Sequence, residues 1–116
     1  MDINEIETNL LKLVREKGHV SFVEVARAFP DEEGDISLVM NGYQNIVYWW
    51  GLSSNVATAI ENLRAAKKLF FVPSTPLLYA IDGVMSKMKI AKSLRQYKEP
   101  RWYPITLHHE PYRETK

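Results

Sequence analysis

The chain has 116 residues, of which 46% are hydrophobic and 25% charged, with a formal net charge of +1, and this balance predicts one globular domain over residues 1–116. The sequence contains no cysteine, which excludes disulfide bonds, thiol catalysis and cysteine-based zinc sites. It has neither an apolar run as long as a membrane span nor the basic and apolar start of a signal peptide, so we expect a cytoplasmic protein that does not contact a membrane.

The net charge hides an asymmetry along the chain. Residues 1–35 hold nine acidic and four basic side chains, whereas residues 36–109 hold nine basic and three acidic ones. If the fold keeps these two parts on different sides, the basic side attracts polyanions through Coulomb forces. The charge pattern therefore permits binding to a polyanion.

The first two helices are predicted from periodicity and from capping residues. Apolar residues recur at spacings of three and four over residues 3–17, and Asp2 and Gly18 are suited to begin and end that helix. Ser21 can begin a second, shorter helix, which Pro30 ends because its ring cannot continue a helix. The residues expected on the buried faces of the two helices are Ile3, Ile6, Leu10, Leu13, Val14, Phe22, Val25, Ala26 and Phe29.

An insertion is expected between the second and third helices. Residues 31–35 are acidic and short of apolar side chains, which is typical of an exposed loop. Residues 36–40 and 46–50 are strand-like, and Asn41-Gly42 between them is a strong hairpin turn signal. A short helix followed by one strand is the alternative, and extended structure is favoured at 46–50.

A third helix and a hairpin follow. Ser53 or Ser54 can cap a helix that ends near Lys68, with Val56, Ile60 and Leu63 on one face. Residues 69–72 and 77–81 are apolar runs separated by Pro73-Ser74-Thr75-Pro76, which predicts a β-hairpin with a turn at the two prolines.

The remaining residues, 84–116, are expected to be a basic C-terminal extension. A fourth helix over 84–98 is one interpretation, although its apolar residues scatter around the helical wheel. Residues 105–107 are expected to add an edge strand, and residues 110–116 to form a frayed tail.

This order of elements resembles the winged-helix branch of the helix-turn-helix superfamily over about residues 3–83. The segments that carry the resemblance are Leu10-Leu11-Lys12-Leu13-Val14, Ser21 to Phe29, Asn55 to Lys68, Leu69 to Val72 and Leu77 to Ile81. The resemblance implies an α+β domain with a three-helix core and a β-hairpin wing, whose third helix enters a DNA major groove while the wing contacts the backbone or minor groove. The insertion of Pro30 to Leu52, Glu61 on the outer face of the third helix and a wing tip without Arg or Lys depart from the family pattern.

Two groups of side chains are candidates for DNA binding. Asn55, Thr58 and Asn62 lie on one side of the third helix, and an Asn can make two hydrogen bonds to an adenine edge. The cations that could contact phosphates are Arg64, Lys67, Lys68, Lys87, Lys89, Lys92, Arg95 and Arg101, with Lys98 in the same stretch. A solvated helix face and lysines that keep the surface soluble are the alternative interpretation of both groups.

Aromatic residues in the insertion suggest a second function. Trp49 and Trp50 are adjacent, so on a regular strand their rings point to opposite sides and one of them, beside Tyr48, can be exposed. An exposed Trp could bind a protein partner, form a homodimer interface or stack on an unpaired base. Burial of both rings in the core is the alternative.

No catalytic or metal-binding motif is evident. His108 and His109 diverge on a strand, and spacing places no third ligand beside them. The sequence has neither a Gly-rich phosphate loop nor a nucleophile motif, so we expect no enzyme activity, metal or cofactor. The sequence therefore predicts a non-catalytic, winged-helix-like DNA-binding domain, with a protein-interaction or dimerisation module that uses residues 36–50 as the alternative.

Overall fold

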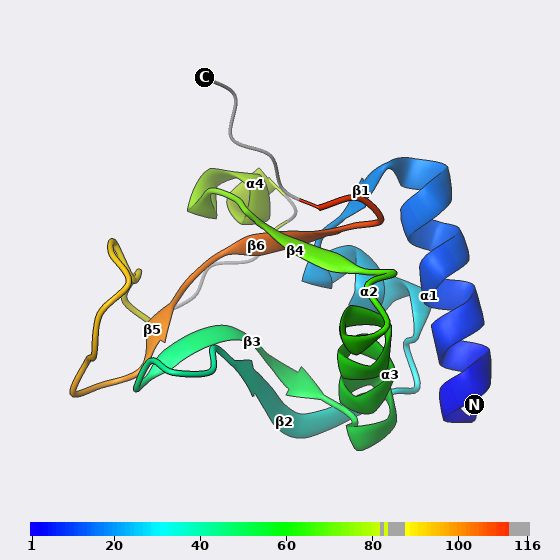
Figure 1. Ribbon diagram of the computed structural model, residues 1–116, viewed down its shortest axis with the longest axis horizontal. Helices are drawn as coiled ribbons and strands as arrows, with labels where there is room; N and C mark the ends of the chain where they lie inside the picture. Colours follow the sequence, from blue (N-terminus) through cyan, green and yellow to red (C-terminus); the bar gives the residue numbers. More distant parts are fainter. Residues whose placement is uncertain (82, 84–87, 112–116) are drawn as a thin grey trace.

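The structure, a computed structural model, describes residues 1–81, 83 and 88–111. Over these residues the chain is an α+β domain with four helices and two three-stranded sheets, which lie beside the helices as two layers (Figure 1). The elements in chain order are α1 (Ile3–Lys17), β1 (His19–Val20), α2 (Phe22–Ala28), β2 (Glu33–Val39), β3 (Ile46–Leu52), α3 (Ser54–Ala65), β4 (Phe70–Pro73), α4 (Pro76–Ile81), β5 (Arg101–Trp102) and β6 (Ile105–His108).

The first three helices begin at the predicted capping residues. The Asp2 side chain accepts a hydrogen bond at 2.8 Å from the amide three residues later, and α1 ends at Gly18, whose φ of 83° lies in the left-handed region. Ser21 and Glu24 form a reciprocal capping box at the start of α2. Ser53 caps α3 in the same way as Asp2 caps α1. The three predicted helices are confirmed.

The first sheet has the strand order β1-β6-β4, with both pairings antiparallel. β6 is its central strand, because His108 lies opposite both His19 of β1 and Phe70 of β4. The expectation that residues 105–107 form an edge strand is therefore wrong. The apolar side chains of β6 are buried, which suits a strand that is paired on both sides.

The predicted hairpin of residues 69–72 and 77–81 is wrong in its second half. Residues 70–73 form β4, but Pro76–Ile81 is the helix α4. Proline suits the first helical position, and the leucines and alanine that follow are good helix formers. The helix directs Tyr79 into the core and leaves Leu77 and Ile81 67% and 78% exposed. β4 pairs instead with β6, more than 30 residues further along the chain.

The hairpin predicted in the insertion is confirmed, and we call this β2–β3 pair the ribbon. Its two strands are antiparallel, but the register shifts at three points. β2 begins at Glu33, so part of the loop expected over 31–35 is strand. A Cβ atom on Gly34 would lie 2.4 Å from the carbonyl oxygen of Leu52, so the close approach of β2 to the end of β3 requires a glycine.

β5 extends the ribbon into the second sheet, with the order β2-β3-β5, and it runs parallel to β3. The described part of the predicted fourth helix, residues 88–98, is not helical. It is an irregular segment in which Ile90 forms a single bridge to Trp102 of β5. Because its apolar residues do not share one helical face, helix formation would have left some of them in water.

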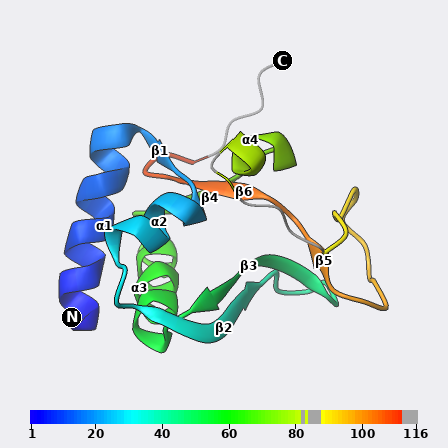
Figure 2. The ribbon, with the colours of Figure 1, turned by 180° about the vertical axis from the view of Figure 1, so that it is seen from behind.

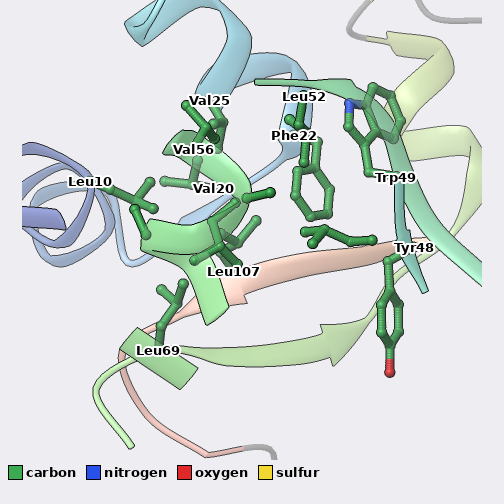
Figure 3. Close-up of a cluster of buried hydrophobic side chains, with 14 of the residues drawn as sticks. Leu10, Val20, Phe22, Val25, Tyr48, Trp49, Leu52, Val56, Leu69 and Leu107 are labelled. Atoms are coloured by element: carbon green, nitrogen blue, oxygen red, sulfur yellow. The ribbon is translucent and has the colours of Figure 1, made fainter. Parts of the chain in front are cut away.

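One core joins the helices to both sheets. Figure 3 shows Leu10, Val25 and Val56 from the first three helices packed together, with side chains of β1 and β6 beside them. In α2, Ala26 was expected on the buried face but is exposed, whereas Val23 is buried. Among the helices of the described residues, none combines the length and the apolar character that a membrane span needs.

Candidate nucleic-acid interface

A segment rich in basic residues, residues 88–101, is anchored on the tip of the ribbon. We call it the basic loop. The Tyr97 amide donates to the carbonyl oxygen of Gln44 at 3.2 Å, and the side-chain amide of Asn45 donates to the carbonyl oxygen of Tyr97 at 3.0 Å. The Gln96 side chain donates to the carbonyl oxygen of Gly42 at 3.0 Å and accepts from the Gln44 amide. These bonds hold the segment in one position, although only its last residue, Arg101, belongs to a strand.

The basic loop carries cations that form no ion pair with the acidic side chains of the described residues. Its five cations are Lys89, Lys92, Arg95, Lys98 and Arg101, and its one acidic residue is Glu99. Four of the cations are exposed and Arg101 is half-buried. None of the five forms an ion pair within the described residues. By contrast, Lys17 pairs with Glu24 at 2.6 Å, so the positive charge elsewhere on the surface is partly compensated. Lys87, the remaining predicted cation of this stretch, lies outside the described residues.

Two arginines of the loop surround a buried tyrosine. The guanidinium carbons of Arg95 and Arg101 lie 4.9 Å and 5.1 Å from the ring centroid of Tyr97. The Tyr97 hydroxyl donates to the carbonyl oxygen of Ser93 at 2.8 Å, and hydrogen bonding with Ser93 lowers the tyrosine pKa. Tyr97 is buried, so its ring is unavailable for stacking on a base. The loop therefore presents positive charge and no aromatic face.

The outer face of α3 is open to solvent and is not covered by the ribbon. Thr58 and Asn62 are exposed, and Asn55 is half-buried. Both asparagines are hydrogen-bonded toward α1, because Asn55 donates to the carbonyl oxygen of Met1 at 3.4 Å and Asn62 donates to the Glu7 carboxylate at 3.2 Å. An acidic side chain of α1 thus lies against the face that was predicted to read bases.

The predicted cations at the end of α3 differ in their surroundings. Arg64 pairs with Glu61 at 3.0 Å, and its guanidinium carbon lies 3.9 Å from the ring centroid of Phe71 and 5.5 Å from that of Tyr48. It is therefore engaged in the fold. Lys67 and Lys68 follow the helix and are exposed.

The structure does not bring the two predicted groups together. The basic loop lies at the end of the ribbon opposite α1, and α3 lies between them in both views (Figures 1 and 2). The helix α1 borders α3 and is remote from the basic loop. The α3 face and the basic loop are therefore separate surfaces, because the ribbon lies between them.

The predicted partner-binding aromatics are largely internal. Tyr48 and Trp49 are each 8% exposed, and Trp50 is half-buried. Tyr48 and Trp49 leave β3 on opposite sides (Figure 3), but the rings of Trp49 and Trp50 stack with centroids 4.3 Å apart. The expected divergence of the two Trp rings is wrong, because the irregular register of the ribbon breaks the alternation of a flat strand. Trp102 packs against both Trp rings and donates from its indole nitrogen to the carbonyl oxygen of Tyr48 at 3.1 Å.

The histidines lie in the first sheet. The rings of His19 and His108 stack with centroids 5.7 Å apart. Burial lowers the pKa of His108 because it disfavours the charged ring, and the nearby His19 and His109 act in the same direction. Within residues 1–81, 83 and 88–111, no three His, Asp or Glu side chains are grouped so that they could hold a metal ion.

The cations of the loop are visible in the sequence, but the groups that position the loop are not. Gln44, Asn45 and Gln96 bind backbone atoms across more than 50 residues, and no local pattern marks such contacts. The Asn41-Gly42 turn signal placed the tip of the ribbon, but it gave no indication that another segment would dock there.

Comparison with family models, curated proteins and solved structures finds no match for this chain. The geometry of the basic loop is therefore the basis for assigning a function.

Proposed function

We propose that the chain is a non-catalytic, winged-helix-like domain that binds double-stranded DNA in the cytoplasm, with the basic loop in contact with the phosphate backbone. The observation that carries the proposal is the set of five cations on the basic loop, which lack ion-pair partners within the described residues and face only one carboxylate of the loop. Unpaired surface cations release counterions from DNA when they neutralise its phosphates.

The charge distribution supports an orientation on the duplex. Four acidic side chains lie in residues 31–35, where the ribbon meets α3, at the opposite end of the ribbon from the tip that anchors the basic loop. A polyanion is attracted to one end of such a molecule and repelled from the other. The basic loop therefore approaches the backbone first, and the α3 end of the ribbon faces away.

The arrangement of strands supports the winged-helix part of the proposal. β4 follows α3 and pairs with β6, so this antiparallel pair occupies the place of the expected wing. Residues 74–104 connect the two strands instead of a four-residue tip, and they contain the basic loop. The predicted wing tip has no Arg or Lys, whereas the longer connection between β4 and β6 carries the cations of the basic loop.

In this proposal, α3 contributes less to DNA binding than the sequence suggested. Asn55 and Asn62 donate to groups of α1, so base contacts from them require those bonds to break. Thr58 is exposed and Lys67 and Lys68 follow the helix, but Glu61 and Glu7 oppose phosphates there. Binding is therefore expected to depend on the backbone more than on base sequence.

The experiment is duplex binding measured over a range of salt concentrations. Replacing Lys89, Lys92 and Lys98 by Gln removes three charges from the basic loop. If each contacts one phosphate, the slope of log affinity against log salt decreases by about 2 to 3, because each neutralised phosphate contributes about 0.9. The matched control removes three charges elsewhere, at Lys12, Arg15 and Lys17 of α1, and we expect the slope to change by less than about 1. Equal effects of the two variants would reject the basic loop as the contact surface.

A second candidate function, dimerisation through the ribbon, is favoured by one observation. β2 is an edge strand, and its Ile36 and Val39 side chains are 38% and 54% exposed. Two copies could pair these edges. Sedimentation of the wild type and of Val39→Lys over a range of concentrations tests this, and a wild type that stays monomeric would reject it.

A further inference from the structure

A hollow of about 380 Å³ lies in the basic loop and has the chemistry of an anion site. The residues that line it are Arg95, Gln96, Tyr97, Lys98, Glu99 and Arg101. Three cations therefore face one carboxylate. The Gln96 side chain is already engaged with the tip of the ribbon, which leaves the cations as the donors available to a ligand.

Arg101 has a donor that the fold does not use. Its Nε atom is buried, and no oxygen of the described residues accepts a hydrogen bond from it. A buried donor without an acceptor is destabilising, and such groups are rare in folded proteins. The Arg101 backbone is fixed, because its amide donates to the carbonyl oxygen of Asn45 at 2.7 Å and β5 pairs with β3. The Arg101 backbone is therefore held in position, and its side chain lines the hollow with one donor that has no partner within the described residues.

We propose that this hollow binds one phosphate group and that Arg101 is its principal ligand. Arg101 lines the hollow, and a guanidinium can present two parallel N–H groups that match two oxygens of a phosphate, whereas a lysine offers only a point charge. Its Nε atom is buried, so a contact through the Nε edge requires the side chain to turn toward the hollow. Arg95 and Lys98 add positive charge at the rim. Because the phosphate is taken to be part of a DNA backbone, this inference rests on the proposed function, but the same chemistry fits a free phosphate ion.

The test begins with inorganic phosphate added to the full ¹⁵N-labelled wild-type chain, followed through the arginine Nε–H resonances. We expect the Arg101 resonance to shift in a saturable way, whereas chloride at the same ionic strength leaves it in place. In a second measurement, Arg101→Lys keeps the charge but loses the fork, and it should weaken phosphate binding at least about 10-fold, the size expected for a charge-assisted hydrogen bond. Arg95→Lys is the matched control and should weaken it less than about 3-fold.

The outcomes separate the inference from the proposed function. If phosphate leaves the Arg101 resonance unmoved while duplex binding remains salt-dependent, the inference is overturned and the proposed function stands. If phosphate binds at Arg101 but duplex DNA does not compete with it, the phosphate site stands and the backbone as its source is rejected. If the wild type binds neither phosphate nor duplex, both are overturned. The wild-type titration does not depend on any variant being folded.

Discussion

Replacement of Tyr79 by Phe removes a buried hydroxyl group that makes two hydrogen bonds. The Tyr79 side chain is fully buried, its hydroxyl donates to the carbonyl oxygen of Ile105 at 2.7 Å, and it accepts from the Phe22 amide at 3.1 Å. This amide opens α2, where the first N–H groups of a helix have no partner within the helix. One hydroxyl thus ties α4 to both α2 and β6.

The expected loss follows from the two groups that Tyr79→Phe leaves buried without a partner. Each unsatisfied buried group costs about 1 to 3 kcal/mol, so we expect the free energy of unfolding to fall by about 2 to 4 kcal/mol. Urea denaturation of the two proteins measures this difference. Removing the hydroxyl leaves no large cavity, so the packing contribution is small.

Tyr43→Phe is the matched control for this prediction. Tyr43 is half-buried, and its hydroxyl makes no hydrogen bond within the described residues. We expect its removal to change stability by less than about 0.5 kcal/mol. Equal losses in the two variants, or a loss below about 0.5 kcal/mol for Tyr79→Phe, would refute the role given to the Tyr79 hydroxyl.

Three further predictions address the ribbon, the first sheet and α3. Gly34→Ala should destabilise the chain by at least about 1 kcal/mol in urea denaturation, because its Cβ would meet the Leu52 carbonyl oxygen at 2.4 Å, and unchanged stability would show that the strands can move apart. The pKa of His108 is lowered in the fold, so the unfolded chain takes up the proton first as pH falls. Stability should therefore be fully present above about pH 6.5 and decline below it, and His108→Phe should remove that part of the decline, as unfolding at pH 7.5 and 5.5 would measure. Thr58→Ala should change duplex affinity by less than about 3-fold, and a larger loss in a binding titration would restore α3 as the main contact.

The parts of the fold that depend on local chemistry could be predicted from the sequence. Asp2, Ser21 and Ser53 cap the first three helices through contacts within three residues, and these positions are visible in the sequence. The two strands of the ribbon were predicted for the same reason, because the Asn41-Gly42 turn and the flanking apolar runs are adjacent.

The parts that depend on contacts distant along the chain could not be predicted. Residues 77–81 have apolar character that suits a strand or a helix, and the choice is made by the burial of Tyr79 against α2 and β6. The central position of β6 requires partners that lie more than 30 and more than 80 residues away in sequence. Local patterns contain no information about such pairings.

The candidate site likewise combines features that the local sequence indicates with features that depend on contacts distant along the chain. The cations of residues 89–101 were recognised from composition alone, and the structure places them on one loop. Their separation from α3 follows from docking of the loop at Gln44 and Asn45, which sequence spacing does not indicate. The buried Nε atom of Arg101 likewise becomes visible only when the neighbouring side chains are placed.

The most direct measurement is a map of amide chemical shifts of the ¹⁵N-labelled chain as duplex DNA is added at low salt. If phosphates contact the basic loop, the largest changes fall within residues 89–103 and at the ribbon tip, residues 42–46, while α1 remains unchanged. Changes centred on α1 or on the exposed side of α4, or none at all, would contradict the assignment of this end of the domain to nucleic acid.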